Sequence, residues 1–194
     1  MNALALTLLG ILLSVAVRSQ PTLIRTFTSA SYGNVIRLVA TPDGGWAVYS
    51  PDSLSLAKFN RCGIREWSRH YDIGSARTQS TLEEIISLPG GFALLSRVET
   101  GGVHAALVIR LDDGGNVLWS KTYGDPFYSL YPYTLLLDPR GNLVITANAA
   151  PTSQGGSGMM VARVDPRTGA LVAGWIHNIG NIWGGAVVTS DGGL

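Results

Sequence analysis

The chain has 194 residues, a formal net charge of +1 and only 14% charged residues. This charge argues against a nucleic-acid-binding protein, because such proteins carry basic patches that neutralise phosphates. Hydrophobic residues make up 46% of the chain, which argues against disorder, because a disordered chain has low hydrophobicity and high charge. The length is that of one ordinary domain.

The first residues form an apolar segment. Residues 1–17 contain no charged side chain. A membrane-spanning helix needs about 20 apolar residues, so the segment lies between a signal-peptide core and a short anchor. Small residues permit cleavage after Ala16 or after Ser19. We expect residues 1–19 to be a hydrophobic leader helix, either a removed signal peptide or an anchor that contacts the membrane. The remainder is then secreted or held at the cell surface.

A turn sequence recurs along the rest of the chain. It is found at Pro42–Val48, Leu88–Leu94 and Asp138–Val144, and it begins again in the last five residues, 190–194. The apolar residue that follows each turn recurs at spacings of 46, 51 and 51 residues. A period of this size is typical of repeat proteins, including β-propellers.

Each copy of the repeat predicts four strands, because Gly-Gly and Asp-Gly pairs between short apolar runs are hairpin signals. The predicted strands are 35–40, 46–50, 55–59 and 64–71 in the first copy, 84–88, 92–98, 105–111 and 117–123 in the second, and 134–137, 143–147, 159–164 and 171–177 in the third. A further strand is predicted at 186–189. One copy is therefore a four-stranded antiparallel meander.

These meanders predict an all-β fold, a partial and open β-propeller of about three and a half blades. The propeller spans residues 20–194, with blades at about 28–71, 78–123 and 130–177 and the start of another at 182–194. A parallel β-helix would need shorter coils, and a β-sandwich would not repeat its turn chemistry.

Trp67 and Trp119 occupy the same position in the last strand of two copies. A repeated aromatic residue at this position predicts packing between neighbouring sheets, and a ligand-binding aromatic residue is the alternative. In the third copy we align Val172 with Trp119, so that Trp175 lies three residues further on.

The repeat resembles a family of secreted bacterial and archaeal β-propeller proteins with tandem Asp-Gly-Gly turns. The matching stretches are Asp43–Trp46, Arg110–Trp119 and Lys121–Gly124. The resemblance extends over about residues 22–194. It implies an extracellular or surface scaffold, and it implies almost nothing about activity.

The ends of the repeat predict an open arc. Residues 23–27 align with Trp119–Tyr123, the outermost strand of a blade, and the blade that this strand would complete is missing. A closed ring usually takes at least four blades. Three explanations remain: a longer protein of which this chain is a fragment, closure by another copy or another chain, and a capped open arc. We favour the fragment.

No catalytic, cofactor-binding or metal-binding residue is assigned. His70, His104 and His177 fall in separate copies, with His177 aligned to Gly124, whereas a metal or nucleophilic site requires converging side chains. We expect surface histidines, and we expect Cys62, the only cysteine, to be a turn residue. Six aspartates lie in turns, where Asp usually accepts hydrogen bonds from its own backbone: Asp43, Asp112, Asp113, Asp138, Asp165 and Asp191.

The expected function is an exported scaffold or interaction module without enzymatic activity. Its expected partner is a protein or a glycan at the cell surface, with no nucleic acid and no cofactor. Loops 51–54, 99–104 and 148–158 are the first candidates for binding, because propellers place ligands on loops or at the channel mouth. The alternative is the N-terminal part of a propeller enzyme, a glycosidase-like hydrolase or a quinone-dependent dehydrogenase, whose active site lies in missing blades.

Overall fold

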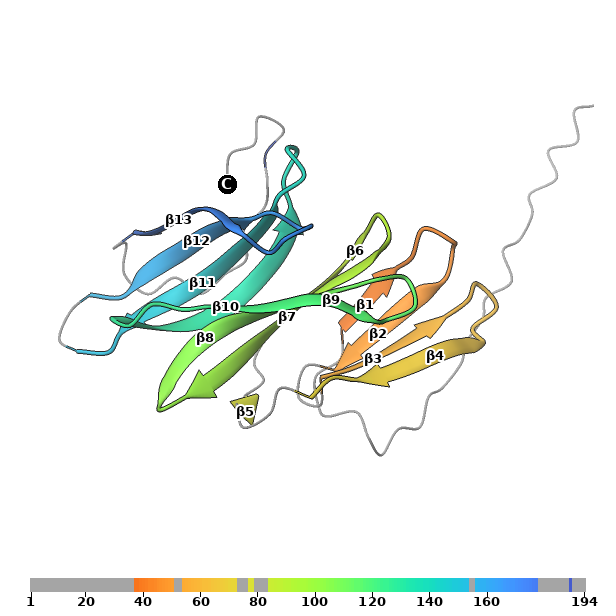
Figure 1. The fold of residues 1–194 in the computed structure, drawn as a ribbon, viewed down its shortest axis with the longest axis horizontal. Coiled ribbons are helices and arrows are strands. Elements are labelled where there is room, and N and C mark those ends of the chain that lie inside the picture. Colours follow the sequence, from red (N-terminus) through yellow and green to blue (C-terminus); the bar gives the residue numbers. More distant parts are fainter. Residues whose placement is uncertain are drawn as a thin grey trace, which may run out of the picture.

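The structure is a computed structural model, and it describes residues 37–50, 54–72, 77–78, 84–153, 156–177 and 189. This part of the chain is all-β, with three antiparallel sheets and no helix (Figure 1). Among the described residues, no helix has the length and apolar character needed to cross a membrane. The predicted leader and the predicted strand 23–27 lie outside the described residues, as does the strand 186–189 except Thr189.

Sheets 1 and 3 are meanders in chain order, and sheet 2 is a meander with one additional short strand. Sheet 1 contains β1 (Arg37–Ala40), β2 (Trp46–Ser50), β3 (Ser55–Phe59) and β4 (Arg65–His70). Sheet 2 contains β5 (Arg77–Thr78), β6 (Ile85–Leu88), β7 (Gly91–Thr100), β8 (Val103–Leu111) and β9 (Val117–Tyr123). Sheet 3 contains β10 (Tyr128–Leu137), β11 (Leu143–Pro151), β12 (Gly158–Val164) and β13 (Leu171–His177). The predicted four-stranded meanders are confirmed, and the two-residue strand β5, which pairs with β7, is an additional strand of sheet 2.

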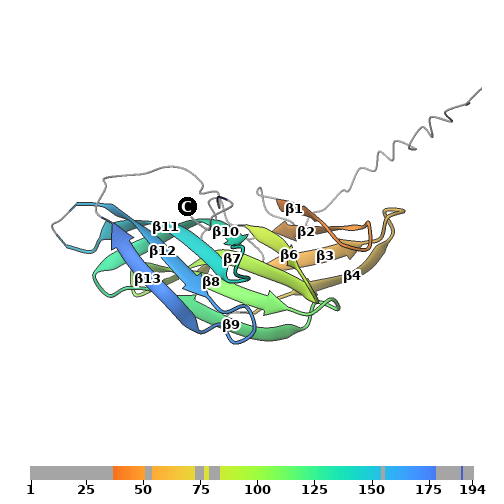
Figure 2. The ribbon, with the colours of Figure 1, turned by 90° about the horizontal axis from the view of Figure 1, so that it is seen from above.

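The sheets follow one another in a row, with sheet 1 at one end and sheet 3 at the other (Figure 2). Within the described residues the row is open and does not close into a ring. This arrangement is consistent with successive blades of a propeller.

The strands of sheet 2 extend further than the sequence predicts. Glu99 pairs with His104 and Thr100 pairs with Val103, so the predicted loop 99–104 is reduced to a turn at Gly101–Gly102. Both glycines have positive φ, 62° and 81°, as the primed turns of two-residue hairpins require. We expected a longer polar loop here. A Gly-Gly pair indicates that the chain turns, but it does not indicate at which residue the backbone pairing of the two strands ends.

Strand β10 begins at Tyr128, whereas we predicted a start at residue 134. Pro132 lies inside the added part of the strand, although proline usually interrupts a strand. Here the register shifts between Pro132 and Thr134, and β10 is an edge strand of its sheet. A bulge on an edge strand tolerates proline, because no ladder hydrogen bond is lost there.

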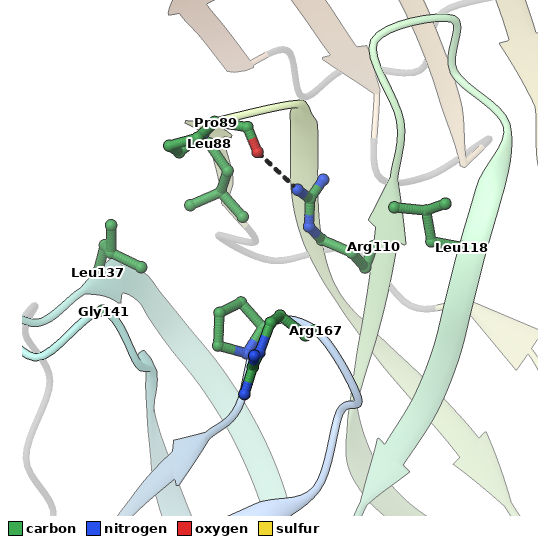
Figure 3. Close-up of a pocket in the computed structure, with 8 residues that line it drawn as sticks. Leu88, Pro89, Arg110, Leu118, Leu137, Gly141 and Arg167 are labelled. Atoms are coloured by element: carbon green, nitrogen blue, oxygen red, sulfur yellow. Dashed lines mark hydrogen bonds between the residues drawn. The ribbon is translucent and has the colours of Figure 1, made fainter.

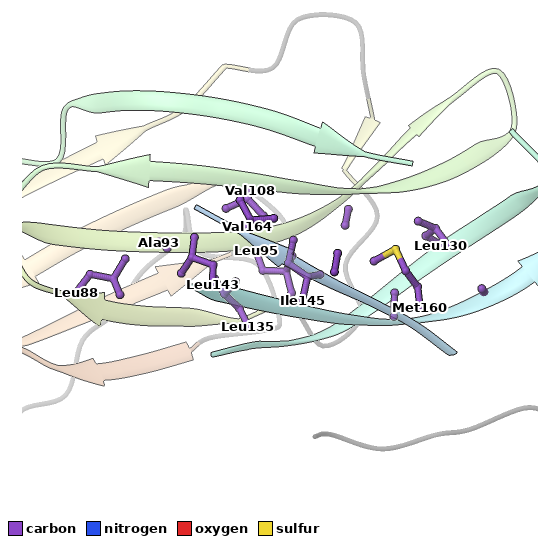
Figure 4. Close-up of a cluster of buried hydrophobic side chains, with 14 residues drawn as sticks. Leu88, Ala93, Leu95, Val108, Leu130, Leu135, Leu143, Ile145, Met160 and Val164 are labelled. Carbon is purple, nitrogen blue, oxygen red and sulfur yellow. The ribbon is translucent and has the colours of Figure 1, made fainter. Parts of the chain in front are cut away.

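Sheet 2 buries both of its faces. One face packs on sheet 1, where Phe92, Leu94 and Ile109 meet Tyr49 and Leu56. The other face packs on sheet 3 (Figure 4). Successive side chains of a strand point to opposite faces, so the apolar runs of β7 and β8 supply both cores.

The first inter-sheet contact is made by a tryptophan and a tyrosine near the two ends of β4. The Trp67 indole N–H donates to the Asp113 carbonyl at 3.2 Å, and the Tyr71 hydroxyl donates to the Gly115 carbonyl at 3.0 Å. Both acceptors lie in the β8–β9 turn of sheet 2. We refer to this arrangement as the Trp–Tyr contact.

The second Trp–Tyr contact repeats the first between sheets 2 and 3. Trp119 donates to the Pro166 carbonyl at 3.0 Å, and Tyr123 donates to the Gly169 carbonyl at 2.8 Å. Trp67 and Trp119 are half-buried and pack against the two cores. The prediction that they fill the space between sheets is confirmed.

The alignment of the third copy is wrong by one residue. Trp119 pairs with Arg110, and the residue that pairs with Arg163 is Ala173, not Val172. The turn before β13 has a wider closing hydrogen bond, from Gly169 N–H to the Asp165 carbonyl. The added residue shifts the strand, so that His177 occupies the position of Tyr123 and not that of Gly124. Sheet 3 therefore has no Trp–Tyr pair at these positions of β13.

The tyrosines of these contacts predict a loss of stability at alkaline pH. Burial raises the pKa of Tyr123 from 10.0 to about 12, and it raises the pKa of Tyr71 as well. Between pH 10 and 12 the unfolded chain releases the phenolic proton while the folded chain keeps it, so stability falls as pH rises. Urea unfolding from pH 8 to 12 should show this fall. Tyr123→Phe should be less stable at pH 8 and less dependent on pH; an equal dependence would contradict the assignment.

Candidate functional site

The repeated aspartates have a structural role in the turns. Their carboxylates accept backbone N–H groups: Asp43 from Gly45 at 3.1 Å, Asp112 from Asn116 at 2.8 Å, Asp138 from Asn142 at 2.8 Å and Asp165 from Arg167 at 2.7 Å. The predicted role of these four residues is confirmed. Asp113 is exposed, and Asp191 lies outside the described residues.

The three histidines lie in three different sheets. His70 is exposed and contacts Ser55 Oγ at 3.3 Å, and His177 is exposed beside the Trp175 ring. His104 differs from the predicted surface histidine, because it is half-buried and its Nδ1 atom is fully covered. In the described part of the chain, no three His, Cys, Asp or Glu side chains gather where a metal ion could be held.

His104 belongs to a polar cluster between sheets 2 and 3. The Arg97 guanidinium carbon lies 5.2 Å from the centre of the Tyr131 ring, and the His104 ring centre lies 5.0 Å from the same ring. The His104 backbone N–H donates to Ser129 Oγ at 2.9 Å. Asn148 pairs with Tyr131 across β10 and β11. We call Arg97, His104, Tyr131 and Asn148 the rim cluster.

The rim cluster holds a buried cation to which the described part of the chain brings no carboxylate. Arg97 is 7% exposed, and within the described residues it forms no ion pair. Its Nε atom, His104 Nδ1 and Asn148 Oδ1 are covered, and none has a hydrogen-bond partner in this part of the structure. Burial of a charged or polar group without a partner costs free energy. The cluster therefore has unused donors and an unused acceptor.

The electrostatics of the cluster are dominated by positive charge. Burial lowers the pKa of His104, the Arg97 charge lowers it further, and Glu99 opposes the shift. His104 is consequently neutral at pH 7, and its covered Nδ1 can accept or donate according to its tautomer. A ligand that brings an anionic or hydroxyl oxygen would satisfy Arg97.

The sequence indicated the place of the cluster and two of its four residues. The predicted loops 99–104 and 148–158 include His104 and Asn148, and both lie next to Tyr131 in the structure. Arg97 was missed inside a run treated as an apolar strand. It lies on the same face of β7 as buried Leu95, and a charged residue at a core position is the signal that could have identified it.

A hollow lies at the opposite ends of the same strands from the rim cluster (Figure 3). It is a cleft of about 430 Å³ between sheets 2 and 3, lined by Leu88, Pro89, Arg110, Leu118, Leu137, Gly141, Pro166 and Arg167. The Arg110 side chain runs toward the Pro89 carbonyl, to which it donates a hydrogen bond. We call it the turn-side cleft.

Fold and geometry define an all-β protein of tandem antiparallel sheets. When the chain is compared with known proteins, no protein-family model matches it and no curated protein matches it. The resemblance to secreted β-propeller repeats therefore stays a prediction based on the turn and strand motifs.

Proposed function

We propose that the protein is an exported β-propeller scaffold that binds a protein or a glycan at the cell surface and catalyses no reaction. Three meanders in an open row support the propeller. The apolar leader and the repeat motifs support export. The Trp–Tyr contacts and the turn aspartates of the repeat motif stabilise the sheets. We therefore assign ligand binding to residues outside the repeat motif.

The rim cluster carries this proposal. Arg97 is buried, lies against Tyr131 and has no carboxylate partner among the residues that the structure describes. Arginine and tyrosine are among the residues that dominate binding energy at protein interfaces. Tyr131 offers an apolar ring face, while Arg97, His104 and Asn148 offer polar atoms without partners. Such a combination suits a peptide or a sugar that brings oxygen atoms.

Arg97→Met provides the test. A buried ion replaced by an apolar residue of similar size leaves stability unchanged or increases it, whereas loss of a charged contact to ligand weakens binding. We expect at least a tenfold loss of affinity for any ligand found on glycan and peptide arrays, with a thermal unfolding midpoint equal to or above that of the wild type.

The matched control is Arg65→Gln, on the exposed strand β4, which should change neither quantity. Unchanged binding in Arg97→Met would contradict the site. Turnover of glycosides, or dehydrogenase activity with an added quinone, would contradict the function and favour the alternative propeller enzyme.

A further inference from the structure

A basic residue recurs at one position of the third strand in every sheet. Lys58 pairs with Trp67, Arg110 with Trp119, and Arg163 with Ala173. In sheet 1 the Lys58 ammonium lies 2.5 Å from the Asp43 carboxylate, and Lys58 also pairs with Glu66.

The equivalent contact in sheet 3 is that of Arg163 Nε with the Asp138 carboxylate at 3.3 Å. Asp43 and Asp138 occupy the turn between the first two strands of their sheets. In the outer two sheets the base therefore has an acid in that turn.

Arg110 in sheet 2 has no such partner. The turn Pro89–Gly90 contains no aspartate and is shorter than the turns of the other sheets. Arg110 donates instead to carbonyl groups, those of Pro89 at 3.0 Å, Gly90 at 3.4 Å and Phe92 at 3.1 Å, together with that of Leu111.

Carbonyl groups satisfy the N–H donors of Arg110 but leave its charge uncompensated. Arg110 is 8% exposed, and burial lowers its pKa, although the charges of Asp112 and Asp113 act in the opposite direction. Neither aspartate forms an ion pair with Arg110 among the described residues. The turn that carries Asp43 in sheet 1 and Asp138 in sheet 3 thus contributes no negative charge in sheet 2.

The turn-side cleft lies beside this position. Among the described residues, its lining contains two cations, Arg110 and Arg167, and no acidic residue. The Arg167 side chain is 87% exposed and lies 3.5 Å from the Asp165 carboxylate. Leu118 and Leu137 line the cleft and are 57% and 42% exposed, so an apolar surface adjoins the unpaired charge.

We infer that the turn-side cleft binds a peptide segment of a partner protein in which an acidic side chain adjoins a leucine-like one. The acidic group compensates the charge of Arg110, whose Nη atoms already donate to carbonyl groups, and Arg167 contributes the second positive charge. The apolar side chain packs on Leu118 and Leu137. This site is independent of the rim cluster, so either can fail without the other.

The test uses the peptides acetyl-Leu-Glu-Leu-amide and acetyl-Leu-Gln-Leu-amide, titrated into the full chain and followed by NMR. We expect the Glu peptide to bind at least tenfold more tightly, with shifts at the residues that line the cleft. Arg167→Gln, exposed and outside the core, should weaken the Glu peptide about fivefold without changing thermal unfolding. Equal affinity for the two peptides would overturn the inference.

A turn graft sharpens the test. Residues 88–91 are replaced by the sequence of residues 41–45, Thr-Pro-Asp-Gly-Gly, which brings a carboxylate to Arg110 within the chain. We expect this graft to abolish preference for the Glu peptide, while a control graft with Asn in place of the Asp retains it. If the Asp graft folds and still prefers the Glu peptide, the charge of Arg110 does not determine the preference of the cleft for an acidic side chain. The peptide pair and Arg167→Gln decide the question if neither graft folds.

Discussion

Replacing Trp119 by alanine is expected to lower the free energy of unfolding by about 3 kcal/mol, the low end of the range for a tryptophan removed from a core. The side chain is half-buried between sheets 2 and 3, where it packs on the apolar cluster and donates to the Pro166 carbonyl. Alanine would leave a cavity and an unmade hydrogen bond. Urea unfolding followed by circular dichroism measures the change.

Two further variants separate packing from hydrogen bonding. Trp119→Phe keeps most of the apolar contact and removes the N–H donor, so it should cost about 1 kcal/mol. Val117→Ala alters an exposed residue of the same strand and should stay within about 0.5 kcal/mol of the wild type. A Trp119→Ala protein as stable as Val117→Ala would show that Trp119 does not hold the sheets together.

Gly115→Ala is expected to destabilise the protein by about 3 kcal/mol, of which about 1 is backbone strain and the rest is overpacking. Gly115 has a φ of +77°, and a Cβ atom there would lie 2.8 Å from Trp67 Cζ3. The alanine methyl group would push the Trp67 ring away from sheet 2. Thermal and urea unfolding measure the loss.

Gly141→Ala is the matched control. Gly141 has a similar φ of +81°, but nothing lies within 4 Å of the Cβ position. It should therefore show the backbone cost alone, about 1 kcal/mol. Equal losses in the two variants would mean that close approach of Trp67 contributes nothing at Gly115.

The sheets could be predicted from the sequence because the signals for them are local. Each hairpin contains its own glycine pair or Asp-Gly turn, and Val117–Tyr123 and Leu171–His177 were predicted with the bounds that the structure has. Trp67 and Trp119 were predicted between sheets because their position repeats. The predicted positions of the strand ends were less accurate, because the backbone pairing on either side of Gly101–Gly102 and the bulge at Pro132 depend on neighbouring strands.

The candidate sites could not be predicted in the same way. Arg97 meets Tyr131 only when β7 and β10 are brought together from different copies, and no local pattern encodes that meeting. Arg110 looked like part of a repeat motif. Its difference from Lys58 and Arg163 lies in the shorter turn of sheet 2, which offers Arg110 a carbonyl group where the other two residues have a carboxylate.

The Trp–Tyr contacts also bear on the order in which the chain folds. They join residues 44 to 47 positions apart in the sequence, and each sheet is built from adjacent hairpins. The contacts within a hairpin and between adjacent sheets therefore join residues of low to moderate sequence separation. Such contacts require less loop-closure entropy to be lost before they form, which favours rapid folding. Sheet 1 is complete once Tyr71 has emerged, and sheet 2 can then dock on a surface that already exists. The chain is suited to vectorial assembly, one sheet at a time, from the N-terminal side.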